Sequence, residues 1–162
     1  MACSRAMDDL REIDAIKRLK YRYMRCLDQK RWAELAECFT EDATTAYGGG
    51  KYTFRGRDAI MRFLVDAMDR PSFLSSHRVH HPEIELTSPG TARGTWALED
   101  FVLDPERKVI IQGAAFYEDE YVKTDGRWRI RATGYQRTFE FVESLAERPS
   151  LRITAGYGPT HG

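Results

Sequence analysis

The spacing of apolar residues changes once along this chain, near Leu74. Before that point they recur every three or four residues, as in Leu10, Ile13 and Ile16, which is the period of an amphipathic helix. After it, apolar and polar residues alternate, as they do in strands with one buried face. Helices followed by a long antiparallel meander are typical of α+β folds. We therefore expect an α+β domain in which a curved antiparallel sheet curls around N-terminal helices and encloses a cavity.

Three helices and one short hairpin are expected before Leu74. Turn or helix-breaking residues separate them, among them the glycines at 48–50 and Pro71. The expected helices cover 9–27, 32–39 and a segment that begins at 56–58, and the expected hairpin joins 43–47 to 51–55.

Four long extended segments are expected after Leu74. The turns that divide them are Ser88-Pro89-Gly90, Asp104-Pro105-Glu106 and Thr124-Asp125-Gly126. The last stretch has a short helical pattern at 143–147, followed by prolines and glycines. The chain is therefore expected to comprise a flexible N-terminus at 1–8, one domain at 9–141, and a C-terminal helix and arm at 142–162.

Length and composition favour one soluble domain. The chain has 162 residues, enough for one core and too few for two ordinary domains. Its 25 basic and 25 acidic residues cancel, with no basic tail, so nucleic acid is not an expected partner. The sequence has no long apolar run or signal-peptide pattern, and its three cysteines lack metal-ligand spacing. We expect a cytoplasmic protein with free thiols, bound to neither membrane nor metal.

Asp28 is the most informative single residue, because it lies where the first expected helix ends. A carboxylate there faces the negative end of the helix dipole, which favours its protonated form and makes it a candidate base. The alternative is that Asp28 caps the next helix or belongs to the turn. The position alone leaves both interpretations open.

Polar residues in the extended segments supply further candidates. Alternation places Asp100 in an otherwise apolar row that includes Trp96 and Val102, unless a bulge turns it outward. His77 and His81 are expected on one face of their strand and His80 on the other. These histidines lack a second ligand cluster for zinc. A histidine close to an aspartate is the better hypothesis, because imidazole accepts protons near neutral pH.

Motifs for other chemistries are missing. The sequence has no GxSxG elbow, no phosphate-binding loop and no dinucleotide fingerprint, so no cofactor is expected. What remains is acid–base chemistry in an apolar cavity. The aromatic residues that are candidates for its walls, or alternatively for the plain core, are Tyr23, Tyr47, Trp96, Phe116 and Tyr117.

Several short motifs together resemble the SnoaL-like group of the nuclear transport factor 2-like superfamily. They are Tyr23-Met-Arg-Cys-Leu-Asp28, Arg31-Trp32-Ala-Glu-Leu, Phe39-Thr-Glu-Asp-Ala43, Phe54-Arg-Gly56-Arg-Asp-Ala59-Ile60, His77 and Lys123-Thr-Asp-Gly-Arg-Trp128-Arg-Ile130. The resemblance extends from about Ile13 to Phe141. It implies a cone of curved antiparallel sheet, closed by N-terminal helices around a deep pocket. The superfamily hosts many functions, so the fold alone does not assign one.

The resemblance implies roles for particular residues. Asp28 and His77 match the dyad of three lyases in this group: scytalone dehydratase, hexachlorocyclohexane dehydrochlorinase and bile acid 7α-dehydratase. Tyr23 and Asp100 match the tyrosine and second aspartate of the bile acid enzyme. Tyr47 resembles a pocket tyrosine of scytalone dehydratase, and Arg137 a substrate-binding arginine.

The chain also departs from scytalone dehydratase. Leu27 and Val102 stand where that enzyme has a tyrosine and a second histidine. Ala115 and Tyr117 replace its pocket serine and asparagine. Scytalone itself is therefore not the expected substrate.

The function expected from these observations is a cofactor-independent lyase. It would eliminate water or another small group from a cyclic or polycyclic apolar substrate. His77 would be the base, Asp28 its orienting partner, Tyr23 a donor to a substrate oxygen, and a protonated Asp100 the acid for the leaving group. The alternatives are a ketosteroid-isomerase-like enzyme and a non-catalytic ligand binder like dioxygenase β subunits. The resemblance also implies a homo-oligomer, with a trimer favoured over a dimer.

Overall fold

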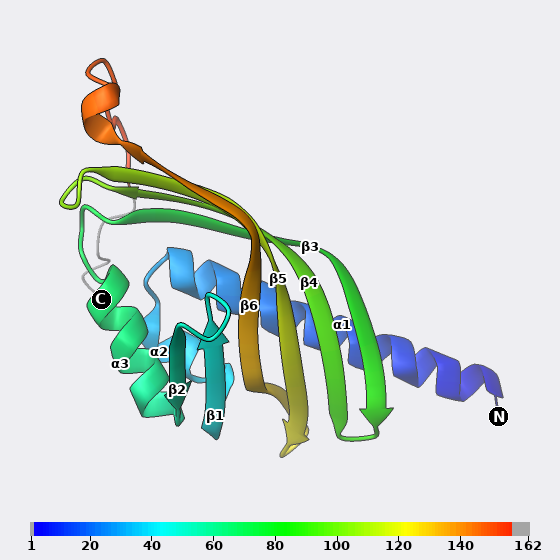
Figure 1. The fold of residues 1–162 in the computed structure, drawn as a ribbon. Helices are drawn as coiled ribbons and strands as arrows, with labels where there is room; N and C mark the ends of the chain where they lie inside the picture. Colours follow the sequence, from blue (N-terminus) through cyan, green and yellow to red (C-terminus); the bar gives the residue numbers. More distant parts are fainter. Residues whose placement is uncertain (1, 157–162) are drawn as a thin grey trace.

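The structure is a computed structural model that describes the backbone of residues 2–156 and the side chains of residues 6–156. The first part of the chain contains α1 (Ala2–Asp28), α2 (Trp32–Ala36), β1 (Phe39–Tyr47), β2 (Tyr52–Arg55) and α3 (Arg57–Met68). The second part contains β3 (Leu74–Ser88), β4 (Thr91–Asp104), β5 (Val109–Thr124), β6 (Arg127–Ser144) and the 3₁₀ turn η1 (Leu145–Glu147). The expected order of helices and strands is confirmed (Figure 1).

The six strands form one open, curved sheet in the order β2-β1-β6-β5-β4-β3. Neighbouring strands are antiparallel, except that β1 runs parallel to β6. The long strands bend over α1, which lies along the concave side of the sheet and packs against β3 and β6 (Figure 1). The predicted α+β class and curved sheet are therefore confirmed, with one parallel strand pair that the turn signals did not reveal.

The core lies between α1 and the concave face of the sheet. From α1 it receives Ile16, Leu19 and Leu27, which recur at helical spacing and are at most 5% exposed. The strands contribute every second residue, for example Trp96 and Leu98 of β4. Because the strands bury only this face, the opposite face keeps polar residues and some exposed aromatic ones.

Three element boundaries differ from those expected. Helix α1 begins at Ala2 rather than residue 9, so 2–8 continue the helix, which the Arg11–Asp8 ion pair supports at one-turn spacing. Helix α2 ends at Ala36, because the chain enters the sheet at Phe39. Strand β6 extends to Ser144, which pairs with Val109, so only 145–147 are helical.

A bulge in β3 corrects the expected placement of its histidines. The pairing register between β3 and β4 shifts between His80 and Glu83, and His81 has a φ of 47°. A bulge inserts an extra residue and resets the alternation of side chains. His81 is therefore exposed instead of sharing the inward face of His77.

The C-terminal arm returns to the start of β3. Residues 148–156 have no regular secondary structure, and Gly156 lies so close to Leu74 that a Cβ there would be 3.1 Å from Leu74 Cδ2. The remainder of the expected arm, 157–162, lies outside the described residues. Of the helices within residues 2–156, none combines the length and apolar character that crossing a membrane requires.

Candidate active site

Asp28 and His77 are in direct contact. Helix α1 delivers the carboxylate at its last residue, and the start of β3 passes beside it. His77 Nδ1 lies 2.7 Å from Asp28 Oδ1, and the backbone N–H of His77 donates to Asp28 Oδ2 at 2.8 Å. The Ser75 hydroxyl donates to Asp28 Oδ1 at 2.8 Å. Three hydrogen bonds from one strand therefore fix this carboxylate.

This geometry selects one form of the imidazole. An ionised carboxylate can only accept hydrogen bonds, so neutral His77 carries its proton on Nδ1 and presents an unprotonated Nε2. The two side chains are 13% and 22% exposed, respectively, so neither is sealed in the core. The pair has the arrangement of a base and its orienting carboxylate.

Asp100 lies beside His77 but differs from the expected acid. It is the cross-strand partner of His77, faces inward and is 6% exposed. Arg137 donates to both of its oxygens, from Nη1 at 2.5 Å and from Nη2 at 2.8 Å. The row is therefore not apolar around Asp100, because both of its oxygens accept hydrogen bonds from a guanidinium. Asp100 lacks the apolar surroundings on which its expected role as an acid was based.

Arg137 is fixed from two sides. Its Nε lies 2.9 Å from a carboxylate oxygen of Glu140, in addition to the bidentate pair with Asp100. Burial acts to lower the pKa of Arg137, but the hydrogen bonds and charge of Asp100 outweigh it and raise the pKa. Arg137, expected to bind substrate, is thus a permanent cation bound to Asp100, the cross-strand partner of His77. Nη1 and Nη2 each donate one hydrogen bond to Asp100, and each has a second N–H for which the described residues 6–156 supply no acceptor.

Gly113 makes room for this arginine. It pairs with Asp100 on one side and Glu140 on the other. A Cβ at Gly113 would lie 2.9 Å from Arg137 Nη1 and 2.7 Å from the backbone oxygen of Phe139. The absence of a side chain therefore lets the guanidinium cross β5 to reach Asp100.

We predict that Gly113→Ala displaces Arg137 and lowers the free energy of unfolding. Overpacking next to a backbone oxygen typically costs about 1–3 kcal/mol. Denaturant titration measures this, with Gly90→Ala as the matched control, because a Cβ at Gly90 meets nothing within 4 Å. Equal stability of the Gly113→Ala and Gly90→Ala variants would contradict the packing role of Gly113.

Tyr23 and Tyr47 form a buried pair. Their hydroxyls are 2.9 Å apart, and the residues are 1% and 4% exposed. Burial is the main cause that raises the pKa of each phenol well above its usual range, so both stay neutral. One hydroxyl donates to the other, which leaves one proton for a third acceptor. Within residues 6–156, no hydrogen bond connects this pair to Asp28 or His77.

The sequence did not predict the ion pair in the core beneath Tyr117. Lys20 Nζ lies 2.7 Å from Asp119 Oδ2, both side chains are fully buried, and the ammonium lies 3.5 Å from the centre of the Tyr117 ring. Asp119 also accepts hydrogen bonds from Tyr121 and Thr133. Burial lowers the pKa of Lys20, although the nearby Asp119 opposes this.

A visible signal could have indicated this pair. Asp119 continues the inward row of Tyr117 and Tyr121, and Lys20 lies one helical turn from the core residue Ile16. An unpaired charge in the core is unfavourable, so two opposite charges at core positions are expected to form an ion pair.

Trp96 and Tyr117 point inward but belong to this core region. Trp96 is 0% exposed and its indole N–H donates to Tyr121 at 2.9 Å. Tyr117 is 2% exposed and packs edge-to-face on Tyr135. Their contact with a substrate stays a prediction.

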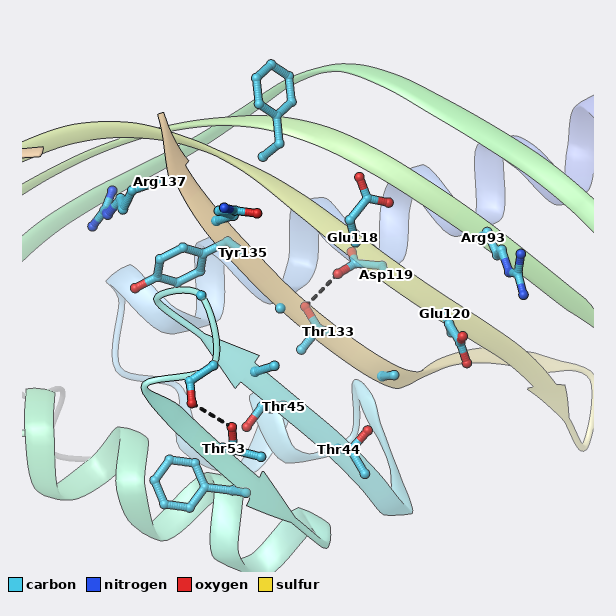
Figure 2. A pocket seen from close by; sticks show the side chains of 18 of the residues that line it. Thr44, Thr45, Thr53, Arg93, Glu118, Asp119, Glu120, Thr133, Tyr135 and Arg137 are labelled. Carbon is cyan, nitrogen blue, oxygen red and sulfur yellow. Dashed lines mark hydrogen bonds between the residues drawn. The ribbon is translucent and has the colours of Figure 1, made fainter. Parts of the chain in front are cut away.

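Phe116 was expected in the cavity wall, and this is wrong. Its neighbours Ala115 and Tyr117 face inward, so strand alternation turns Phe116 to the other face, where it is 51% exposed. It borders a hollow of about 1030 Å³ between the outer side of the sheet and the β1–β2 hairpin. Figure 2 shows Glu118, Glu120 and Arg93 around this hollow, which Asp28 and His77 do not line.

His80 and His81 do not extend the dyad. His80 Nε2 lies 3.4 Å from a carboxylate oxygen of the exposed Glu99, and the His81 ring lies beside it. Within the described part of the chain, no three His, Cys, Asp or Glu side chains are grouped as metal ligands.

Comparison with known protein families places this fold and dyad in context. The profile of the SnoaL-like domain matches residues 8–133. This chain belongs to the SnoaL-like family. The match contains Asp28, His77 and Asp100, whereas Arg137 lies just beyond it. The resemblance of the short motifs to this family is thereby confirmed.

Solved structures with this SnoaL-like fold cover nearly the whole chain. A putative scytalone dehydratase from Novosphingobium aromaticivorans is 22% identical, with a TM-score of 0.74 over 95% of this chain and 97% of that one. A hexachlorocyclohexane dehydrochlorinase (LinA-type3) from Novosphingobium barchaimii is 20% identical, with a TM-score of 0.76 over 93% and 99%. A protein of unknown function from Mycobacterium tuberculosis is 25% identical, with a TM-score of 0.71 over 91% and 81%. These similarities establish the nuclear transport factor 2-like fold.

Proposed function

We propose that this SnoaL-like protein is a cofactor-independent lyase that eliminates water or a small anion from a cyclic, apolar substrate. The observation that carries the proposal is the Nδ1–Oδ1 contact of 2.7 Å between His77 and Asp28, in a His77 side chain that is 13% exposed and whose Nε2 has no hydrogen-bond partner among residues 6–156. Two of the similar structures are described as a dehydratase and a dehydrochlorinase, both of which eliminate a small group. The fold similarity supports the reaction class and leaves the substrate open.

In this mechanism His77 takes the proton. Nε2 removes a proton from a ring carbon. The electron pair of that C–H bond forms the new double bond, and the carbon–oxygen or carbon–halogen bond on the neighbouring carbon breaks. Asp28 stabilises the imidazolium that forms. The imidazolium then gives its proton to the departing hydroxide or to water, which restores the base. Atoms and charge balance without a metal or redox group.

The leaving group is assigned to Arg137 instead of Asp100. Asp100 accepts hydrogen bonds from Arg137 at both oxygens, and so holds the guanidinium on the strand position opposite His77. The two remaining N–H donors of Arg137 can stabilise a departing hydroxide or halide. Tyr23, paired with Tyr47, remains the proposed donor to a substrate oxygen.

The alternatives fit the geometry less well. A ketosteroid-isomerase-like enzyme needs one aspartate free to shuttle a proton and another kept protonated. Here Asp28 accepts three hydrogen bonds and Asp100 is ion-paired. A non-catalytic binder gives no reason for Asp28 to orient His77. The contact between the two therefore favours catalysis.

The proposal is tested by incubating the protein with cyclic hydroxy-ketones and halocarbons after dialysis against a chelator. Elimination should appear as the absorbance of a new double bond, and no added cofactor should be needed. A panel of steroids, phenolic ketones and polyketides covers the relevant ring sizes. Binding of panel members without any turnover would instead support the ligand-binding alternative.

We also propose that the chain forms a homotrimer through the outer face of the sheet. Four phenylalanines on the strands β4 to β6 are 40–55% exposed; they are Phe101, Phe116, Phe139 and Phe141. Register places Phe101, Gln112 and Phe141 in one cross-strand row, so these side chains share the face away from α1. Exposed apolar patches of this kind mark association surfaces.

Light scattering after size exclusion tests the trimer. The expected mass is about three times the 18.7 kDa of one chain. Phe139→Glu with Phe141→Glu should shift the protein to monomer, whereas Leu151→Glu, on the exposed arm, should not. A monomeric wild type at micromolar concentration would contradict this assembly.

A further inference from the structure

A second hollow, of about 840 Å³, lies between α1, the turn that joins β5 to β6, and the start of α3. Neither Asp28 nor His77 lines it, so it is separate from the proposed active site. Its volume is in the range of ordinary small-molecule sites. Its lining contains seven cationic side chains and two carboxylates, although the chain as a whole has no net charge.

Six of the seven cations come from three elements that converge, and the seventh, Lys123, lies at the end of β5. Arg11, Arg18 and Arg22 follow one another on α1 at intervals of seven and four residues, which places them on a single helix face. Arg127 and Arg129 alternate with the buried Trp128 at the start of β6 and so share one side of that strand. Arg57 is the first residue of α3, where the helix dipole adds positive potential.

Nearby carboxylates pair with four of the seven cations, among them Arg57, which lies 3.9 Å from Glu41, and leave three without a partner within the described side chains. Both carboxylate oxygens of Glu12 already accept a hydrogen bond, one from Lys123 at 2.7 Å and the other from Trp128 at 2.5 Å. The hydrogen bond from Lys123 has the larger effect, and together the two lower the pKa of Glu12. Glu37 is the second carboxylate of the lining. Arg11 and Arg18 have carboxylate partners at neighbouring turns of α1, Asp8 and Asp14, on the exposed surface.

Three arginines of the lining have no carboxylate partner. Among the side chains of residues 6–156, no carboxylate lies within 4.0 Å of Arg22, Arg127 or Arg129. The Nε of Arg22 is also buried and has no hydrogen-bond partner among those side chains. A buried donor without a partner is unfavourable, so negative charge close to this guanidinium would be stabilising. Guanidinium groups bind phosphate oxygens in matched pairs of hydrogen bonds.

We propose that this hollow binds an organic phosphate. Arg22, Arg127 and Arg129 hold the phosphate group, and Ala15, with the small exposed part of the otherwise buried Leu19, forms the apolar wall for the carbon skeleton. The site serves a ligand distinct from the substrate of the His77 dyad and does not depend on the proposed elimination. The chain as a whole has no net charge and no basic tail, so a small ligand in this hollow is a better candidate than a nucleic acid backbone.

Calorimetric titration at constant ionic strength tests the site with three probes: phenyl phosphate, inorganic phosphate and benzoate. Phenyl phosphate should bind at least about threefold more tightly than either other probe, because only it has both the dianion and an apolar body. Its affinity should fall as salt is raised. The His77→Gln variant should bind it as the wild type does.

Matched variants locate the site. Arg22→Gln combined with Arg127→Gln should weaken phenyl phosphate at least about tenfold, because two charge-assisted contacts are lost. Arg22→Lys with Arg127→Lys, which keeps the charge, serves as the folding control. Arg131→Gln should change nothing, because Arg131 pairs with Glu120 and does not line the hollow. Absence of saturable binding below about 10 mM would overturn the proposal. So would equal affinity for phenyl phosphate and inorganic phosphate, or binding unchanged in the double glutamine variant.

Discussion

Replacing His77 by glutamine should lower kcat for elimination by about 10³-fold, because general bases typically contribute 10²–10⁴. Glutamine keeps the approximate size and polarity of the side chain but cannot take a proton near neutral pH. The backbone N–H of residue 77 still donates to Asp28 Oδ2, so the start of β3 should remain in place. Initial rates on the best substrate of the panel measure the effect.

His80→Gln is the matched control for that change. His80 lies on the same strand but pairs with the exposed Glu99, away from Asp28. Its replacement should leave kcat within about twofold of the wild type, as surface changes usually do. Comparable rates in the two variants would remove His77 from the mechanism and leave the dyad as a structural contact.

Replacing Asp28 by asparagine is expected to have the second largest effect, a loss of kcat of about 10²–10³-fold. Asparagine removes the charge that stabilises the imidazolium, and its amide can donate to Nδ1 and so favour the wrong tautomer. Ser75→Ala should cost much less, because it removes only one of the three bonds that fix Asp28. Thermal unfolding of both variants separates this effect from loss of fold.

Two other outcomes for the Ser75→Ala and Asp28→Asn variants would contradict the role proposed for the Asp28 charge. If Ser75→Ala slowed turnover as much as Asp28→Asn, the position of the carboxylate would matter more than its charge. If Asp28→Asn retained full activity, His77 would not need an orienting partner, and the proposed division of roles would be wrong.

Periodicity predicted the fold because local spacing and tertiary burial agree in this chain. The apolar stripe of Ile16 and Leu19 packs against the sheet, and alternation along β4 places Trp96 and Asp100 inward. The α+β class needed no long-range information, since the turns between the four long strands lie at proline and glycine signals. The start of α1 was missed because 2–8 lack an apolar stripe and still continue the helix.

Details of the candidate site depend on contacts that span the chain, and these were harder to predict. The sequence placed Asp100 inward, but its partner Arg137 reaches it only across the side-chain-free Gly113. The proximity of Asp28 to His77 came from a family resemblance, because the two are 49 residues apart. Phe116 was misplaced because adjacent residues of one strand cannot both face the cavity. A bulge moved His81, and no periodicity reveals a bulge in advance.

The central claim is that Asp28 acts through His77, and a double-mutant cycle on kcat/KM tests it most directly. Wild type, His77→Gln, Asp28→Asn and the double variant are compared on one substrate at one pH. If Asp28 only makes His77 a better base, the double variant should be within about threefold of His77→Gln alone, because residues that act as a unit are not additive. Losses that multiply in the double variant would contradict the account, since each residue would then contribute independently.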